Sequence, residues 1–194
     1  MAQPFTPEQR DAIRARLMES ARRHAISDGV KKTSLDTLTS DAGISKSSFY
    51  KFFDSKELLF LEIAAGWENQ ILSCVQDALK SSEDKSDQER AAAMICAAFQ
   101  EIHALGICRF LSEDLPELVQ FISDEEKRKH YLSSAQGIFD MLHQKEIHFT
   151  APDEIVLSAI QILYLSIMHI QQIGVNFFPT LHILVTGACK ELVA

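Results

Sequence analysis

The 194-residue sequence contains little glycine and proline, seven and five residues respectively, and a single tryptophan. Turn-rich β folds need such residues at their many turns, so their scarcity favours an all-helical chain. The four cysteines, at positions 74, 96, 108 and 189, form no CxxC pair. The first residues show neither a basic start nor an apolar run, so we see no export signal and expect reduced thiols in a cytoplasmic protein.

The motifs of the common enzyme classes are also missing. The sequence has no G-x-G-x-x-G, P-loop, H-E-x-x-H or G-x-S-x-G pattern, and its acidic pairs lie in runs typical of solvated surfaces. The seven histidines raise the alternative of a metal site, but His143 and His148 are five residues apart, on different faces of a helix. We therefore expect no catalytic residue, cofactor or metal, and a small helical enzyme is kept only as an alternative.

Charge is distributed unevenly along the chain, whose net charge is −8. Residues 1–57 contain 10 Lys and Arg against 8 Asp and Glu, a net charge of +2, whereas residues 58–194 contain 9 against 19, a net charge of −10. An asymmetry of this kind can mark an end of the chain that faces nucleic acid. The N-terminal part is therefore the place to look for such a site.

No Asp, Glu, Lys or Arg occurs between Ile155 and Cys189. A membrane hairpin is one interpretation, but polar residues interrupt the stretch before it reaches the roughly 20 apolar residues that a span needs. A buried pair of helices is favoured, and two such pairs facing each other would form a four-helix dimer core. We expect a homodimer through the last two helices, about residues 153–192, with Ile167 and Leu184 at the contact, and no membrane partner.

Capping residues and apolar periodicity predict helices along the whole chain. Thr6-Pro7 with Gln9 is typical of a helix start, and an apolar stripe follows it until Gly29. Ser34 and Ser45 precede two further short segments, separated by a tight turn at Gly43-Ile44. The predicted helices span about 6–28, 34–42, 45–53, 55–79, 92–106, 124–145, 153–170 and 181–192, with a short helical piece ending near 116 and a turn at 176–180.

The segment from residue 34 to residue 53 is a helix-turn-helix pattern, in which a glycine turn joins two short helices. Phe49 and Phe53 are four residues apart and can face the core, whereas Lys46 and Tyr50 lie on another face. Hydroxyls and cations on that face suit the major groove of DNA, where they reach base edges and phosphates. The alternative is a three-helix packing unit with a polar outer surface.

The order of residues in this segment resembles a known signature. The stretch TSLDTLTSDAGISKSSFYKFFDSKELL, Thr33 to Leu59, is similar to the DNA-binding signature of TetR-type bacterial transcriptional regulators. Thr39 stands where that pattern has alanine, Ser47 where glycine is common, and Phe52 where histidine or tyrosine is usual. The resemblance implies a homodimer and a DNA-binding face. We take this face to comprise Ser34, Ser45, Lys46, Ser47, Ser48, Tyr50, Lys51 and Lys56.

These observations predict an all-α protein of about nine helices in two domains. Residues 1–60 would be the DNA-binding domain, and residues 61–194 a helical effector-binding and dimerisation domain. The expected function is that of a repressor released from a palindromic DNA operator by a small, largely apolar effector; a ligand-independent or activating regulator is the alternative. The candidate effector-binding residues, which could instead be ordinary core, are Trp67, Phe99, His103, Phe110, Tyr131 and Tyr164.

Overall fold

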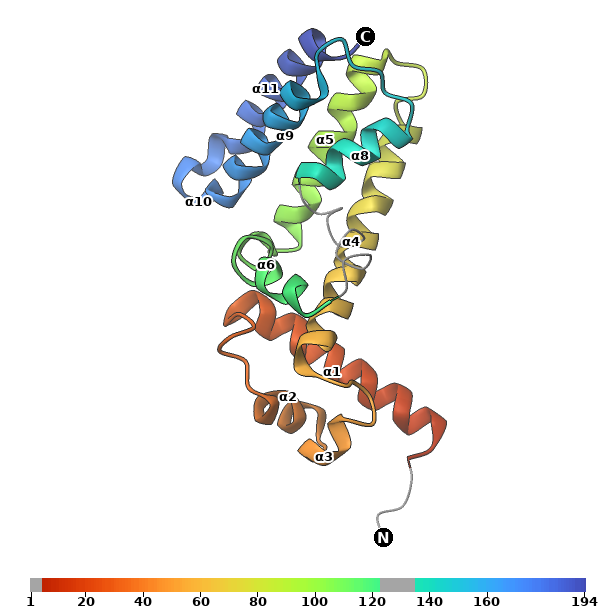
Figure 1. The fold of residues 1–194 in the computed structure, drawn as a ribbon, viewed down its shortest axis with the longest axis vertical. Coiled ribbons are helices and arrows are strands. Elements are labelled where there is room, and N and C mark those ends of the chain that lie inside the picture. The colour runs from red at the N-terminus through yellow and green to blue at the C-terminus, as the bar shows by residue number, and fades with distance from the viewer. Residues whose placement is uncertain (1–4, 123–134) are drawn as a thin grey trace. The chain divides into compact units, whose positions relative to one another are not determined.

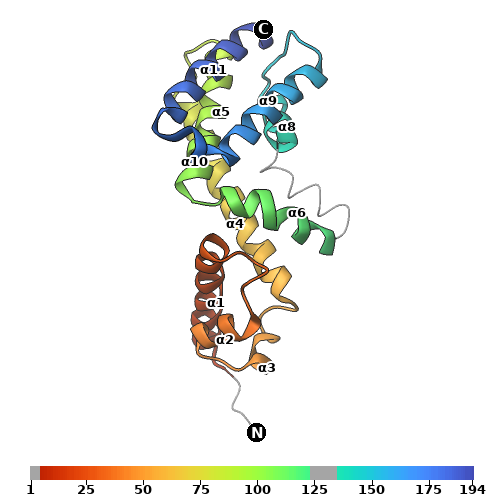
Figure 2. The same ribbon diagram turned by 90° about the vertical axis from the view of Figure 1, so that its left-hand side faces the viewer.

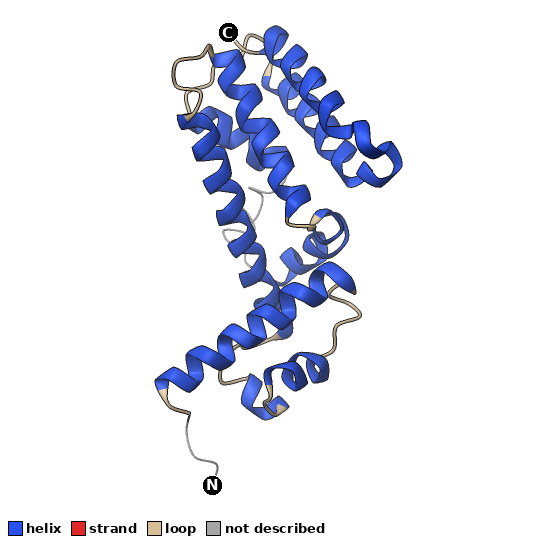
Figure 3. Ribbon diagram, turned by 180° about the vertical axis from the view of Figure 1, so that it is seen from behind, coloured by secondary structure: helices blue, strands red, loops and turns tan. Residues whose placement is uncertain are grey.

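The computed structural model describes residues 5–122 and 135–194 of the chain. Within these ranges the regular elements are helices and the rest is loop (Figure 3), apart from an isolated backbone bridge between Phe149 and Val193. The predicted all-α fold class is thereby confirmed. The chain forms two compact units, one from residues 1–66 with 109–122 and the other from residues 67–108 with 123–194. The predicted domain boundary near residue 60 stays a prediction.

The first unit is built around helix α1 (Pro7–Ser27), which lies against α2 (Leu35–Ala42) and α3 (Lys46–Phe49) (Figure 1). It also contains the start of α4 (Lys56–Lys80), a π-helix (Phe110–Asp114), α6 (Leu115–Leu118) and a 3-10 turn (Val119–Phe121). Helix α1 begins with the predicted capping box between Thr6 and Gln9. Its predicted apolar stripe is buried and consists of Ile13, Leu17, Ala21 and Ala25.

The second unit combines the rest of α4 with α5 (Asp87–Ala104), α8 (Ala135–Gln144), α9 (Asp153–Met168), α10 (Ile170–Ile173) and α11 (Phe177–Leu192). Helices α9 and α11 run side by side, and α11 also lies against α5 (Figure 2). Part of the helix predicted over 124–145 falls outside the described residues. By length and hydropathy no single described helix could cross a membrane; only α9 together with residues 170–192 passes, as a pair bent by 71°.

Several predicted element ends differ from the structure; α5, for example, begins at Asp87 and not at residue 92, with Ser86 as its N-cap. The turn predicted at residues 176–180 is wrong, because α11 already begins at Phe177 and accommodates Pro179 in its first turn, where a missing N–H loses no helical hydrogen bond. Helix α3 has only four residues instead of two turns. After Phe49 the backbone continues in tighter turns, with the Phe52 N–H donating to the Phe49 carbonyl at 2.8 Å, and this brings the Phe53 ring back into the core.

Candidate nucleic-acid interface

The turn between α2 and α3 is formed by local capping interactions. The Ser34 hydroxyl accepts a hydrogen bond from the Thr37 N–H at 3.0 Å, and the Ser45 hydroxyl accepts one from the Ser48 N–H at 3.3 Å. Between them Gly43 ends α2 with a φ of 68°, a left-handed conformation that favours glycine over other residues. The predicted helix-turn-helix is therefore present, with both predicted caps in place.

Aromatic side chains fix α3 to the rest of the first unit. Phe49 is completely buried, and its ring centroid lies 5.8 Å from that of Phe53. The guanidinium of Arg14 on α1 in turn lies over the Phe53 ring, 4.6 Å from its centroid. Because the apolar side of α3 is anchored in this way, its opposite side is held outward in a fixed orientation.

The outward side of α3 carries the polar residues that the sequence singled out. Ser45, Lys46, Ser47 and Tyr50 are exposed, and Ser48 is half-buried. Tyr50 leaves 58 % of its surface exposed while its ring edge contacts Phe49, with the centroids 5.5 Å apart. A phenol held at its base and free at its hydroxyl can donate or accept a hydrogen bond outside the protein. These five residues, Ser45 to Ser48 and Tyr50, are called the α3 face below.

All three predicted DNA-binding lysines have partners in the free protein, and two of them, Lys46 and Lys51, are exposed. The ammonium of Lys46 lies 2.7 Å from the carboxylate of Asp36 on α2, with both side chains exposed. An exposed ion pair of this type contributes little free energy, so Lys46 can leave Asp36 for an external anion at low cost. The ammonium of Lys51 lies 5.5 Å from the centre of the Phe5 ring and is exposed to solvent.

Lys56 occupies a different position from the α3 face. Its half-buried ammonium donates hydrogen bonds to the backbone carbonyls of Val30 and Thr33, both at 3.0 Å. It therefore holds the loop between α1 and α2, a structural role that the lysine itself did not reveal in the sequence. The predicted contact between Lys56 and a DNA phosphate stays a prediction.

Replacement of Lys56 by methionine separates these two roles. We expect the first unit to lose about 1–3 kcal/mol of unfolding free energy in a urea titration, because two buried carbonyls lose a charged donor. If Lys56 also contacted a phosphate, the slope of log affinity for DNA against log salt would fall by about one. Lys80→Met, which removes an exposed lysine near the other end of α4, is the matched control. Unchanged stability in Lys56→Met would contradict the structural role.

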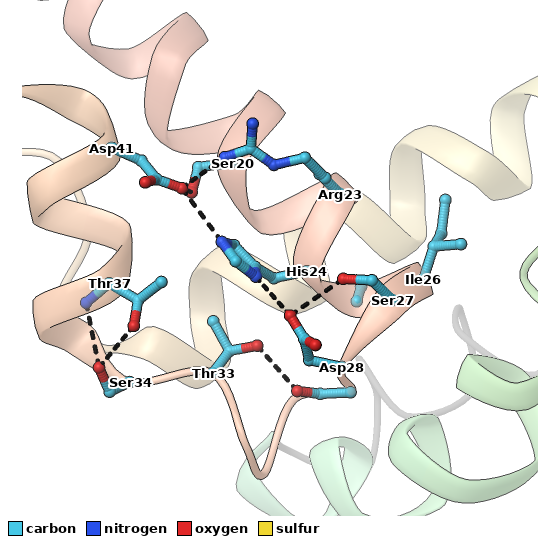
Figure 4. A network of polar contacts seen from close by, with 12 residues as sticks. Ser20, Arg23, His24, Ile26, Ser27, Asp28, Thr33, Ser34, Thr37 and Asp41 are labelled. Atoms are coloured by element: carbon cyan, nitrogen blue, oxygen red, sulfur yellow. Dashed lines mark hydrogen bonds and ion pairs between the residues drawn. The ribbon is translucent and has the colours of Figure 1, made fainter.

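A polar network joins the end of α1 to α2 (Figure 4). Asp41 Oδ2 accepts hydrogen bonds from Ser20 at 2.7 Å and from Arg23 at 2.5 Å, and lies 3.1 Å from His24 Nε2. His24 Nδ1 lies 2.7 Å from a carboxylate oxygen of Asp28. This second contact, more than that to Asp41, raises the pKa of the His24 imidazole above 6.5. The network thus holds α2 against α1 just before the turn at Gly43.

The three departures from the usual TetR-type signature each have a place in the structure. Thr39 is buried, and its hydroxyl donates to the Leu35 carbonyl at 2.9 Å, so the extra polar atom is satisfied. The Phe52 ring lies between Phe5, at 5.9 Å between centroids, and the Arg10 guanidinium, at 5.2 Å from the ring centre. Ser47 is exposed on the α3 face. None of the three disrupts the helix-turn-helix.

The candidate effector residues are distributed over both compact units. Trp67 and Phe99 are buried in the second unit, and Phe110 is buried in the first. His103 is exposed on α5 with its ring edge-on to Phe178, and Tyr164 on α9 is half-buried. Burial, followed by the nearby Cys108 thiol, raises the pKa of the Tyr164 hydroxyl above its usual range. Tyr131 lies outside the described residues, and the effector assignment of all six stays a prediction.

Two small apolar cavities lie among the described residues of the second unit, and neither is lined by a candidate effector residue. One of about 20 Å³ lies between α5, α9 and α11. Another, of about 10 Å³, is lined by six apolar residues and by Glu68. A polar hollow of about 400 Å³ between the start of α5 and α11 is open to solvent. Neither apolar cavity approaches the roughly 300 Å³ at which pockets for small molecules begin, so binding there would require side chains to move.

Glu68 is a candidate site residue that the sequence analysis missed. It is the one carboxylate among the described residues that line the smaller apolar cavity, and burial raises its pKa to about 7 from an ordinary value of 4.5. The signal available in the sequence was that Glu68 is one of only two acids, the other being Glu62, within a largely apolar stretch, residues 58–72. A carboxyl group in such surroundings can orient a polar group of a mostly apolar ligand.

Glu68 should make stability fall as pH rises. Between pH 4.5 and 7 the folded protein binds a proton at Glu68 that the unfolded chain has released, so folding loses free energy as pH increases through this window. Glu68→Gln should therefore raise the melting temperature at pH 8 and lose this advantage near pH 4.5. Asp77→Asn, which removes an exposed carboxylate from the same helix, is the control and should show no such trend. A constant difference between wild type and Glu68→Gln across this range would refute the assignment.

The cysteines offer no activated thiol. Burial raises the pKa of Cys74, Cys96 and Cys108, and it raises the pKa of Cys189 to about 11. Cys108 therefore does not have a lowered pKa, although Arg109 follows it in the chain. In the described parts of the chain, no group of three His, Cys, Asp or Glu side chains is placed to hold a metal ion.

Residues 17–63 match a family model described as bacterial regulatory proteins, tetR family. This range begins in the middle of α1 and ends in α4, so it contains the whole helix-turn-helix and the α3 face. None of the curated protein sequences matches the chain.

Several solved structures share the fold over nearly the whole chain. The ketosteroid transcriptional regulator KstR2 of Mycobacterium tuberculosis is 19 % identical, covers 93 % of this chain and 95 % of its own, and has a TM-score of 0.65. A tetR-family regulatory protein from Rhodococcus RHA1 is 15 % identical over 92 % and 95 % of the two chains, with a TM-score of 0.64. The regulator FadR of Bacillus subtilis, solved in complex with stearoyl-CoA, is 16 % identical over 90 % and 96 %, with a TM-score of 0.60.

Proposed function

We propose that this chain, whose residues 17–63 match the tetR family model and whose fold resembles that of tetR-family regulators, is a sequence-specific DNA-binding repressor acting in the cytoplasm. The observation that carries the proposal is the α3 face. Three hydroxyls, a lysine and a tyrosine project from a capped helix whose other side is fixed by the buried Phe49.

This face has the chemistry needed to read a duplex. A short helix can enter the major groove, where serine hydroxyls reach the edges of several bases and lysine reaches guanine or phosphate. Ser34, at the start of the eight-residue α2, and Lys51 are exposed and would contact the flanking phosphates. Phosphate contacts position the protein, and the α3 face would then select the sequence.

A second copy of the chain would complete the regulator. Helices α9 and α11 expose large apolar side chains, although no charged residue occurs between Ile155 and Cys189. The exposed residues are Ile155, Ile162, Leu165, Ile183 and Leu184. A self-complementary apolar surface of this kind favours a two-fold dimer, and two α3 faces related by a two-fold axis would read a palindromic operator.

A small, largely apolar effector would release the repressor from its operator. The interior of the second unit is apolar apart from a few groups such as Glu68, and the FadR neighbour was solved with stearoyl-CoA, whose acyl chain is apolar. A ligand that binds a conformation unsuited to the operator lowers operator affinity by its preference for that conformation. The other candidate is a regulator that needs no effector or that activates transcription.

Selection of binding sequences from random duplex DNA tests the DNA-binding function. We expect a palindromic sequence to be enriched, and footprinting on it to show protection of two half-sites. Lys46→Ala and Tyr50→Ala should each weaken this complex by about tenfold or more, because each removes a direct contact worth about 1–3 kcal/mol. Lys80→Ala, which removes an exposed lysine from the last turn of α4 in the second unit, should bind like wild type. Wild-type binding by Lys46→Ala would remove the α3 face from the interface.

The effector is tested in the same assay by adding acyl-CoA thioesters and steroid-like molecules. An effector should lower operator affinity and change the fluorescence of Trp67, the single tryptophan, which is buried in the second unit. Trp67→Phe and His103→Ala should alter the release of DNA more than the binding of DNA. A regulator whose affinity for DNA no ligand of these classes changes would favour the ligand-independent alternative.

A further inference from the structure

The last turn of α1 is capped by a side chain from a distant part of the chain. The guanidinium of Arg109 donates to the carbonyl of Ala25 at 2.9 Å and to that of Ile26 at 3.1 Å. These are carbonyls at the end of a helix, which have no partner within the helix itself. Arg109 therefore supplies the hydrogen bonds, and the positive charge, that the C-terminal end of α1 requires.

Asp114 holds the next part of the same connection. This residue ends the π-helix, is only 7 % exposed, and accepts a hydrogen bond from the Val30 N–H at 3.2 Å. Its second carboxylate oxygen, Oδ2, is buried and has no hydrogen-bond partner among the described residues. Burial accordingly raises the pKa of Asp114, although the Val30 N–H and the Arg109 charge oppose the shift.

Gly29 lies between these two side chains and makes the arrangement possible. Its φ is 89°, and a Cβ atom at this position would come within 2.5 Å of Arg109 Nη1 and 3.4 Å of Asp114 Oδ2. No side chain fits at 2.5 Å without displacing the guanidinium. We call Arg109, Asp114 and Gly29 the loop clamp.

The loop clamp holds the segment on which the position of α2 depends. Residues 28–34 connect α1 to α2, and Ser34 at the end of this segment is the N-cap of α2. Within the loop the Thr33 hydroxyl donates to the Gly29 carbonyl at 2.8 Å, so a displacement of Gly29 reaches the residue next to Ser34. The clamping segment, residues 109–122, belongs to the first unit, but the residues that flank it in the chain, 108 and 123, belong to the second.

We propose that Arg109 and Asp114 are positioning residues for the α3 face, and that their grip on the Gly29–Thr33 loop sets operator affinity. The proposal rests on the DNA-binding function proposed above. When the loop clamp is closed, α2 starts at a fixed place. Helix α3, which follows the turn at Gly43, is then held in the orientation that fits the major groove of DNA. When residues 109–122 no longer contact the loop, α2 and α3 lose their fixed starting position, while the buried Phe49 keeps them folded.

The loop clamp can open at low cost in free energy because Asp114 does not have all of its hydrogen bonds. A buried carboxylate with one bare oxygen has a lower net stability than one with all its hydrogen bonds, since the desolvation of the bare oxygen is not offset. Release would return Asp114 to water and recover part of that cost. A conformational change in the second unit that displaces residue 108 or residue 123 would therefore act on the loop clamp, whose contacts contribute little net free energy.

Alanine and conservative variants at the two positions test the proposal. In full-length Asp114→Ala, amide hydrogen exchange at Val30 should accelerate, and affinity for the selected operator should fall about tenfold, as expected for loss of a charged hydrogen bond. Affinity for non-specific duplex, which depends on phosphate contacts, should change much less. Asp114→Asn retains an acceptor for the Val30 N–H and should recover most of the operator affinity. Arg109→Ala should behave like Asp114→Ala, and Arg109→Lys should recover part of the loss.

A nearby ion pair supplies the matched control. Lys31 and Glu117 join the same loop to the same segment at 2.6 Å, but both side chains are largely exposed. Glu117→Gln should therefore leave operator affinity within about twofold of wild type. Gly29→Ala is a second, independent way to open the clamp, because the new methyl group displaces the guanidinium without removing it, and it should reproduce the defect of Arg109→Ala.

The possible outcomes separate this proposal from the one on which it depends. If wild type selects no operator, the proposed DNA-binding function fails. If wild type binds but Asp114→Ala and Gly29→Ala accelerate exchange at Val30 and leave operator affinity unchanged, the clamp holds the loop without positioning the α3 face, and the proposal is overturned. Equal losses of operator and non-specific affinity, or no rescue by Asp114→Asn, would overturn it as well, because both indicate a general loss of folding.

Discussion

A glutamate in place of Ile162 or Leu184 is expected to give monomers whose affinity for the palindromic operator is lower by about a hundredfold or more. Ile162 on α9 and Leu184 on α11 expose 69 % and 57 % of their surface, so neither change disturbs the core of one subunit. In a two-fold dimer each substitution would place two like charges in an apolar contact, and their desolvation opposes association. A monomer would read only one half-site of the proposed operator and would lose the gain from linking two DNA-binding domains.

Sedimentation at micromolar concentration and operator titration measure the two effects. Leu58→Glu, a change at an exposed leucine of the first unit, is the control for oligomeric state and should remain dimeric. The sequence suggested Ile167 as an equivalent test position, but Ile167 is fully buried, so a charge there would unfold the subunit instead of separating two subunits. A wild-type monomer, or a dimeric Ile162→Glu, would show that α9 and α11 are not the interface.

The second large effect is expected from Phe49→Ala, which should destabilise the first unit by about 3–5 kcal/mol. Phe49 is fully buried, and its ring contacts both Phe53 and Tyr50. Loss of the ring leaves a cavity under α3, which has only four residues and little stability of its own. DNA binding should be lost together with the folded helix-turn-helix.

Urea unfolding followed by circular dichroism measures the loss of stability. Phe121→Ala is the matched control, because Phe121 is in the same unit but leaves 67 % of its surface exposed, and it should cost less than about 0.5 kcal/mol. A Phe49→Ala protein as stable as wild type would mean that α3 is supported by contacts other than this ring. The outward orientation of Lys46 and Tyr50 would then need another explanation.

Features that depend on neighbouring residues could be predicted from the sequence. The caps at Thr6, Ser34 and Ser45 are local, because a hydroxyl satisfies an N–H two or three residues further along. The turn at Gly43 is predictable for the same reason, since its left-handed conformation selects glycine. The fold class followed from these signals together with the apolar periodicity of the long helices.

Features that depend on distant contacts could not be predicted. Nothing in the local sequence shows that Lys56 holds two carbonyls at residues 30 and 33, or that Asp114 meets Val30, because each contact joins segments far apart in the chain. The side of α9 that faces the core could not be predicted either. Its inward residues include Ile160 and Ile167 and its outward residues Ile155 and Ile162, and with apolar residues on both sides periodicity cannot decide which side is the core.

Because residues 109–122 belong to the first unit, this unit cannot be exchanged between regulators as one continuous N-terminal segment. A chimaera that joins the first 60 residues of this chain to the ligand-sensing part of another protein would leave Gly29 and Val30 facing a foreign segment in place of Arg109 and Asp114. The transplanted residues would keep α3 but lose the side chains that cap α1 and fix the following loop. A modular exchange should therefore carry both pieces, residues 1–66 and residues 109–122, as a single cassette.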